Sequence, residues 1–154
     1  MKRSVASYLL IFLIFIQIIS AVPAGWILIT DPSGINLGLP IEMLQYSPFP
    51  DFLIPGLFLF IVLGIFPTII VYGLIKKPEF KLINKINLYK KYHWSWTFSY
   101  YLGLLLVLWI NMELLFIREY SFLQVIISVL GVAIIFITHL PRTKRDYIIN
   151  SAHE

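Results

Sequence analysis

Four stretches of the sequence are long, apolar and without Asp, Lys or Arg at their centres. A helix needs about 20 apolar residues to cross the roughly 30 Å hydrocarbon layer of a bilayer. Backbone groups in lipid must also find their hydrogen-bond partners within their own segment. The sequence therefore predicts an all-α membrane protein, a bundle of four transmembrane helices in a single membrane domain. The helices are expected at residues 5–22, 52–75, 96–117 and 122–140.

The segments between these runs differ in composition. Residues 23–51 are rich in Pro and Gly. Within them, Asp31-Pro32-Ser33-Gly34 is a turn sequence, because Asp caps it, Pro presets φ and Gly permits a positive φ. Pro40 suits the first position of a short helix. We expect residues 23–51 to form an ordered extracytoplasmic cap between the first two helices, and residues 76–95 to form a basic inner loop.

The first apolar run also has features of a secretory signal. Lys2 and Arg3 precede it, and Val22-Pro23-Ala24 resembles a small-residue cleavage site. The run is at the long end for a signal peptide, so we interpret it as an uncleaved transmembrane span.

Composition favours lipid over water as the surrounding solvent. Of the 154 residues, 59% are hydrophobic and 13% are charged, whereas a soluble domain is about half apolar and about a quarter charged. Cysteine is absent, which excludes disulfides, thiolate metal sites and thiol–disulfide redox chemistry.

The positive charges predict one orientation in the membrane. Eleven of the twelve Lys and Arg residues lie in three places, Lys2–Arg3, Lys76–Lys91 and Arg142–Arg145. Because loops rich in Lys and Arg stay on the cytoplasmic side, we expect a multi-pass protein of the cell (inner) membrane with both termini cytoplasmic. These clusters lie in loops next to the bilayer and not on a soluble domain, so nucleic acid is not expected as a partner. The opposite side carries Asp31, Glu42, Asp51, Arg118 and Glu119.

Aromatic residues near the ends of the runs are predicted to mark the two membrane interfaces, because amphipathic rings favour the level of the headgroups. On the outer side these are Trp26 and Tyr120, and on the inner side His93, Trp94 and Trp96.

Several motifs together resemble a recurring pattern. They read DPSG…LGxP…SPFxDxLIPG from Asp31 to Gly56, followed by His93-Trp94-x-Trp96, Leu108-Trp109-Ile110, Tyr120, Leu123-Gln124 and Leu140-Pro141-Arg142. The pattern covers nearly the whole chain and is similar to that of an uncharacterised family of small bacterial four-span integral membrane proteins. The resemblance implies a four-helix membrane protein of bacterial type. It implies no activity and no catalytic residue.

Glu113 is the acid that best fits a functional role, because an ionisable residue inside a membrane is a candidate site by default. Asn111 lies two residues before it. A pocket under the cap would be lined by Trp26, Asp31, Asp51, Asn111 and Glu113, which we predict as ligand-binding residues. The alternative is that Glu113 reaches water or pairs with Arg118, which is about one helical turn away.

Metal binding is not predicted from the remaining polar residues. Four carboxylates on one side could attract a cation, but the spacing of Asp31, Glu42, Asp51 and Glu113 matches no metal motif. The three histidines, His93, His139 and His153, also lack metal-ligand spacing.

Small residues interrupt the bulky side chains of the second span and of the hairpin formed by the third and fourth. They are predicted to let neighbouring helices approach closely, and Pro67 is expected to kink the second span. These residues are Gly56, Gly64 and Gly73 in the second span, and Gly103, Ser128 and Gly131 in the hairpin.

The inner loop alternates lysines with apolar and aromatic residues. This suits a segment on an anionic leaflet, where each Lys contributes roughly 1 kcal/mol, although the charges could equally serve only to set topology. The predicted headgroup contacts are Lys76, Lys77, Lys85, Lys90 and Lys91.

No nucleophile–base pair, phosphate-binding glycine loop or GxSxG motif is present in the sequence. Neither catalytic residues nor a cofactor are therefore predicted. The first hypothesis is a non-enzymatic interaction or accessory protein that acts through helix packing or lipid contacts, with a membrane-protein partner or a second copy of itself. The alternative is a binder of lipid-like ligands, or a lipid-modifying enzyme, with a pocket under the cap. A small transporter or channel is the third hypothesis.

Overall fold

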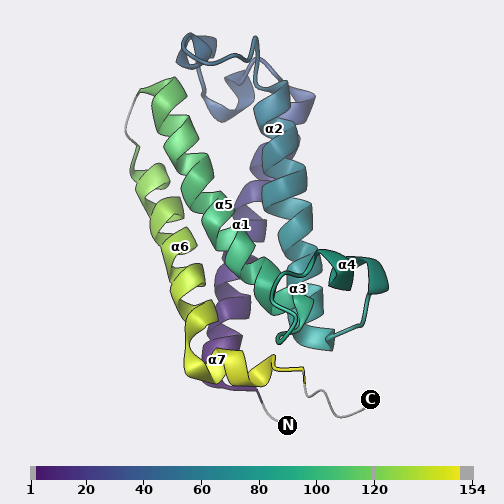
Figure 1. Ribbon diagram of the computed structural model, residues 1–154. Helices are drawn as coiled ribbons and strands as arrows, with labels where there is room; N and C mark the ends of the chain where they lie inside the picture. Colours follow the sequence, from purple (N-terminus) through teal and green to yellow (C-terminus); the bar gives the residue numbers. More distant parts are fainter. Residues whose placement is uncertain (1–2, 119–120, 150–154) are drawn as a thin grey trace.

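Four long helices form an elongated bundle (Figure 1). This computed structural model describes residues 3–118 and 121–149. Each of the four is long and apolar enough to cross a membrane, and the prediction of an all-α protein with four transmembrane helices is confirmed. The four spans are α1 (Val5–Thr30), a second span from Leu53 to Lys76, α5 (Trp94–Ile117) and α6 (Phe122–His139). The sequence predictions made for Lys2, Glu119, Tyr120 and His153 lie outside the described residues.

The outer surface of the bundle is apolar. No more than 33% of the most apolar window of any span is buried inside the protein. Soluble proteins rarely expose apolar surface this extensive and continuous, whereas hydrocarbon solvates it without penalty. Large apolar side chains point outward from every span, among them Phe12, Ile19, Leu57, Leu108, Leu115, Val129 and Phe136.

The first helix is longer than the sequence predicted. It continues through Pro23 and ends at Thr30, so the cap begins at Asp31 and not at residue 23. A Pro inside a helix removes one hydrogen bond and costs about 3 kcal/mol, but close packing against the second span outweighs this cost. At Gly25 the two helices approach so closely that an added Cβ would lie 2.6 Å from the backbone nitrogen of Phe60.

The second span contains a widened turn just before Pro67. It consists of α2 (Leu53–Phe60), a π-helical turn η3 (Ile61–Ile65) and α3 (Phe66–Lys76), with Pro67 in the first turn of α3. Pro67 has no N–H to offer the carbonyl of Leu63, four residues earlier. The side-chain amide of Gln17 in α1 donates to that carbonyl at 3.4 Å. The irregular turn and the Gln17 amide together accommodate the proline.

The glycines of the spans pack inside the bundle, as predicted. Gly103 of α5 and Gly131 of α6 face each other, since a Cβ on Gly103 would lie 2.8 Å from the carbonyl oxygen of Gly131. Gly56 and Gly64 face α1 in the same way, and Gly73 faces the ring of Trp94. These contacts hold α1 against the second span and α5 against α6.

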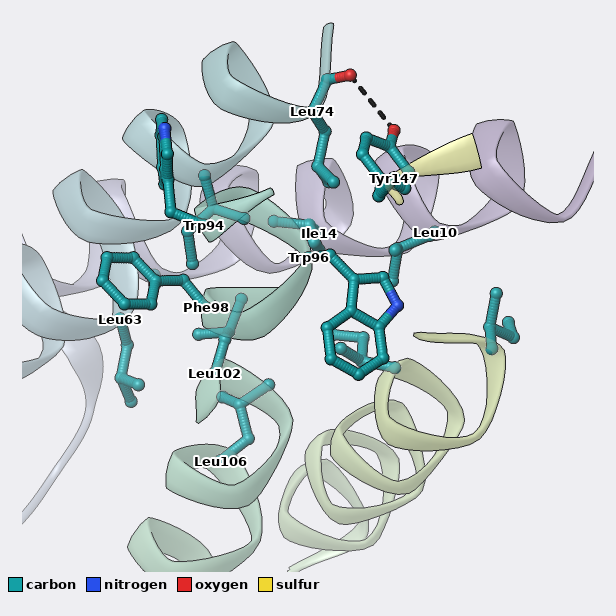
Figure 2. Packing of buried hydrophobic residues seen from close by; sticks show 14 residues of the cluster. Leu10, Ile14, Leu63, Leu74, Trp94, Trp96, Phe98, Leu102, Leu106 and Tyr147 are labelled. Atoms are coloured by element: carbon teal, nitrogen blue, oxygen red, sulfur yellow. Dashed lines mark hydrogen bonds between the residues drawn. The ribbon is translucent and has the colours of Figure 1, made fainter. Parts of the chain in front are cut away.

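The main core lies between α1, the second span, α5, α6 and Tyr147, and it contains the residues labelled in Figure 2. Trp94 and Trp96, which were predicted to mark the inner membrane interface, are buried in this core and are 0% and 1% exposed. Their indole N–H groups donate to the carbonyls of Pro78 at 2.8 Å and Thr138 at 2.7 Å. Both rings can be buried because their one polar atom has a partner.

Short helices close one end of the bundle, the end where α3 finishes and α5 begins. They are α4 (Lys81–Ile86) and α7 (Pro141–Asp146) (Figure 1). We call this end the basic end, because it holds Arg3, the segment Lys76–Lys91 and the segment Arg142–Arg145.

The residues after α6 join the two termini in a terminal clasp formed by Ser4, Ser7, Asp146 and Tyr147. The Asp146 carboxylate accepts hydrogen bonds from the Ser4 N–H at 2.7 Å and the Ser7 hydroxyl at 2.8 Å. The Tyr147 hydroxyl donates to the carbonyl of Leu74 at 3.1 Å (Figure 2). The clasp therefore links α1, α3 and the C-terminal segment.

The opposite end is covered by the cap segment, residues 31–52. It contains two 3-10 turns, η1 (Ile35–Leu37) and η2 (Ile41–Leu44), the second of which follows Pro40 as predicted. The φ of 81° at Gly34 explains why glycine stands in this turn. A small second core of Leu28, Leu44 and Phe52 attaches the segment to the bundle. We call this the cap end.

Candidate ligand cavity

A cavity of about 420 Å³ lies beneath the cap segment. Its walls come from α1 between Gln17 and Leu28, from α2, from α5 between Trp109 and Ile117, and from the start of α6. Side chains of the cap segment, including Leu44 and Phe52, form its roof. The wall is predominantly apolar, so the few polar groups in it decide what it can recognise.

The cavity lies between two closely packed helix pairs. The most extensive contacts in the bundle are those of α1 with α2 and of α5 with α6, and glycines hold each pair together. Contact between the pairs on this side includes the stacked rings of Phe58 and Trp109, with centroids 4.4 Å apart. Residues of all four helices line the space between the pairs.

Among the described residues that line the cavity, Glu113 is the one that carries a carboxylate. Its side chain lies close to those of Trp109 and Gln124, which also line the cavity. The Gln124 oxygen accepts the backbone N–H of Ser121 at 3.0 Å in a capping box at the start of α6. The amide NH₂ of Gln124 is the group that remains to face Glu113.

Gln17 supplies the deepest polar group. Its side chain is 1% exposed and lines the cavity. The amide nitrogen donates to Leu63, but the side-chain oxygen has no hydrogen-bond partner within the described part of the chain. A buried acceptor without a partner is uncommon in proteins, because it loses its interaction with water and gains nothing in return. Gln17 is thus a residue of the cavity wall with an unpaired acceptor.

The serine hydroxyls in the wall are engaged locally. Ser20 donates to the carbonyl of Gln17 at 2.9 Å, and Ser47 pairs with the backbone of Phe49. The Ser121 hydroxyl accepts the backbone N–H of Gln124 at 3.3 Å. The polar atoms left for a ligand are therefore mainly the acceptors of Glu113 and Gln17.

The exposed residues of the cavity wall belong to the spans and not to the cap segment. The cap residues in the wall are buried or half-buried. The exposed wall residues are Ser20, Met112, Ser121 and Leu123, which belong to α1, α5, the N-cap of α6 and α6.

Of the five residues predicted to bind a ligand, the structure places Glu113 in the cavity wall and the other four outside it. Trp26 lies within α1, is 56% exposed and packs on the ring of Phe60. Asn111 is exposed and donates to the carbonyl of Val107 at 2.7 Å. These two side chains face outward because α1 and α5 turn other residues toward the cavity.

The two predicted acids of the cap segment stabilise local turns. Hydrogen bonds from the Ser33 hydroxyl and the Asn36 N–H lower the pKa of Asp31 below its usual value. Asp51 accepts the backbone N–H of Leu53 at 2.9 Å at the start of α2. Asp31 thus has the turn role that the sequence predicted, and Asp51 caps the start of a helix.

Arg118 does not approach Glu113 as one reading of the sequence expected. Its guanidinium lies 4.1 Å from the centre of the Tyr46 ring, a cation–π contact between the end of α5 and the cap segment. This contact helps to close the roof, and it directs the basic residue nearest to Glu113 in the sequence away from the cavity.

Gln17 was not predicted from the sequence as part of a site. A polar side chain within an otherwise apolar span is the signal that could have identified it. Trp109 and Gln124 gave no such signal, because a tryptophan and a helix-capping glutamine have ordinary structural roles.

The lysines predicted to contact headgroups fall into two groups. Lys77 donates to the backbone carbonyl of Asp146 at 2.5 Å, and Lys90 donates to the carbonyls of Asn84 and Lys85. Burial and the nearby Arg3 lower the pKa of Lys77. Lys76, Lys85 and Lys91 are exposed at the basic end.

Within residues 3–118 and 121–149, no three His, Asp or Glu side chains come together in a way that could hold a metal ion.

Comparison with known proteins yields no match among protein-family models, curated proteins or solved structures. The resemblance to a family of small bacterial membrane proteins therefore stays a prediction. The helices themselves define the class, which is a multi-pass, all-α integral membrane protein in contact with the lipid bilayer.

Proposed function

We propose that this protein binds a lipid-like amphiphile in the cavity beneath the cap segment. The observation that carries the proposal is an apolar cavity beneath the cap segment whose exposed wall residues belong to the spans α1, α5 and α6 and the N-cap of α6, and not to the cap segment. Such a site exchanges its ligand with the bilayer and not with water.

The dimensions and chemistry of the cavity support this function. Ligand pockets commonly have volumes of roughly 300 to 1,000 Å³, apolar walls and a small number of orienting polar groups. The cavity has a volume of about 420 Å³ and is lined by aliphatic and aromatic side chains around Glu113 and Gln17. An apolar chain would fill the wall region, and the polar groups would orient its head.

A photoreactive long-chain amphiphile tests the proposal in the intact protein reconstituted in nanodiscs. Labelling is expected on cavity residues, and mass spectrometry should find it on the peptides that contain Ala24 and Met112. Ala24→Phe places a ring in the cavity wall and should reduce this labelling several-fold. The matched control is Val129→Phe, because Val129 is 62% exposed on the lipid-facing side of α6 and does not line the cavity.

Labelling confined to lipid-facing positions such as Val129 would overturn the proposal. So would cavity labelling that Ala24→Phe leaves unchanged while the protein remains folded.

The accessory-protein hypothesis loses one of its supports. Small residues could have formed an interface for a partner helix, but Gly56, Gly64, Gly103 and Gly131 are in contact with other helices of the same chain. A partner or a second copy would have to bind the bulky outer faces of the spans.

We further propose that the basic end faces the cytoplasm and rests on an anionic leaflet. Exposed apolar residues, among them Leu82 and Ile86 of α4, accompany the exposed Lys85 there, a combination that suits a membrane surface. Replacing Lys76, Lys85 and Lys91 by Gln should lower the number of phosphatidylglycerol molecules retained in native mass spectra. Arg118→Gln at the cap end is the control, and equal losses in both variants would contradict this part of the proposal.

A further inference from the structure

The polar groups of the cavity specify what a ligand must carry. This inference rests on the ligand-binding function proposed above. Two acceptors stand in an apolar wall, the Glu113 carboxylate and the side-chain oxygen of Gln17. Because the hydroxyls of Ser20, Ser47 and Ser121 already have local partners, donors on the ligand would complete the site.

Glu113 marks the position of the head group. It lies one turn before the end of α5, toward the cap end. Trp109 and Gln124 lie close to its side chain, whereas the guanidinium of Arg118 is held over the ring of Tyr46. A carboxylate in such surroundings attracts a cationic or hydrogen-bond-donating head group and repels an anionic one.

Gln17 marks a second, deeper position. Its oxygen lacks a partner within the described residues, while its nitrogen donates to the carbonyl of Leu63. At about 1.5 Å per residue along each helix, Gln17 lies on the order of 10 Å further from the cap end than Glu113. If the head of a ligand lies at Glu113, Gln17 lies beside an atom partway along the ligand's chain.

We propose that the cavity selects a long-chain amine that carries a second hydrogen-bond donor, a hydroxyl or an amide N–H, within its chain. The amine lies at Glu113 and the chain donor at the oxygen of Gln17. Gln17 is then a specificity-determining residue, and the surrounding aliphatic wall accommodates the rest of the chain.

Competition against the photoreactive amphiphile in nanodiscs tests this selection. The competitors are octadecylamine, octadecanoic acid, and octadecylamines with one hydroxyl moved along the chain. Octadecylamine is expected to compete about tenfold better than the acid, as for a hydrogen bond to a charged group. A hydroxyl at the matching position should add a gain of about threefold, as for a neutral hydrogen bond.

Variants assign each preference to its residue. Glu113→Gln should remove the preference for the amine over the acid and keep the gain from the chain hydroxyl. Gln17→Leu should remove the hydroxyl gain and keep the amine preference. Asn111→Leu is the control, because Asn111 lies on the same helix as Glu113 but outside the cavity, and it should change neither preference.

The outcomes separate this inference from the function on which it rests. If none of the competitors displaces the probe, ligand binding itself is refuted. If amine and acid compete equally, or the acid competes better, the cavity binds amphiphiles but the head-group assignment is wrong. If Gln17→Leu fails to fold, the role of Gln17 is tested by the hydroxylated octadecylamines on the unmodified protein. A gain in competition that does not depend on the position of the hydroxyl overturns that role.

Discussion

The side-chain amide of Gln17 reaches from α1 to the backbone carbonyl of Leu63, the residue four positions before Pro67. A proline has no N–H for the carbonyl four residues before it, and in lipid no water is available to donate to that carbonyl instead. One side chain of the first span therefore compensates for a proline in the second. The same side chain lines the cavity, so it connects the stability of the irregular turn η3 with the ligand selection proposed above.

This relationship predicts a coupling between Gln17 and Pro67. Gln17→Leu should lower the free energy of unfolding by about 1 kcal/mol, because the Leu63 carbonyl loses its donor. In a Pro67→Ala background the cost should be smaller, because the restored N–H of residue 67 can serve that carbonyl. Unfolding in detergent of the two single variants and the double variant gives the coupling energy. Equal costs of Gln17→Leu in both backgrounds would contradict the compensation.

Close contact between Gly103 and Gly131 predicts that the α5–α6 pair tolerates no side chain there. Gly103→Ala should destabilise the protein by about 1 to 3 kcal/mol, because the added methyl meets the backbone of α6 and the side chain of Ile135. The measurement is the unfolding midpoint in detergent. Val129→Ala on the lipid-facing surface serves as the control and should stay within about 0.5 kcal/mol of the unmodified protein.

The terminal clasp predicts a loss of stability in acid. Burial opposes the charge on Asp146, but hydrogen bonds from Ser4 and Ser7 outweigh it and hold the pKa of Asp146 below its usual value of 3.8. A carboxyl with a lowered pKa in the folded state stabilises the protein above the unfolded-state pKa. That contribution is lost as the pH falls from 3.8 through the lower folded-state pKa.

Asp146→Asn tests this prediction. The variant should unfold at a lower temperature than the unmodified protein at neutral pH, and the difference should shrink as the pH falls below about 4. Thermal unfolding across this range measures both effects. Glu42→Gln in the cap segment is the control, since Glu42 is exposed and lies far from the clasp in the sequence. A constant difference at all pH values would exclude the hydrogen-bonded carboxylate as its cause.

The absence of cysteine allows the proposed orientation to be tested with single substitutions. Ile35→Cys places a thiol in the cap segment, where the native side chain is 77% exposed, and Leu88→Cys places one at the basic end, where it is 78% exposed. A membrane-impermeant maleimide added to intact cells should label Ile35→Cys and reach Leu88→Cys only after permeabilisation. The reverse pattern would invert the orientation derived from the lysines.

The cavity could be predicted from the sequence only in part. The sequence pointed to Glu113 and to a pocket under the cap, because an acid within a span and a long Pro- and Gly-rich connection are local features. It did not bring Gln17, Trp109 and Gln124 to the same cavity, since these residues are up to 107 positions apart in the chain. Their convergence depends on which face each helix turns inward.

Local hydrophobicity alone determined the four spans and the gathering of positive charges in the loops, because the cost of placing a residue in hydrocarbon depends mainly on that residue and its near neighbours. Tertiary packing decided the rest. Packing against the second span at Gly25 accompanies the continuation of α1 past Pro23. The same packing of helices buries Trp94 and Trp96 in the core and leaves Trp26 exposed. In lipid, an apolar side chain has a similar solvation free energy whether it faces the hydrocarbon or the protein interior. Shape complementarity and hydrogen bonds between helices therefore determine which way it faces.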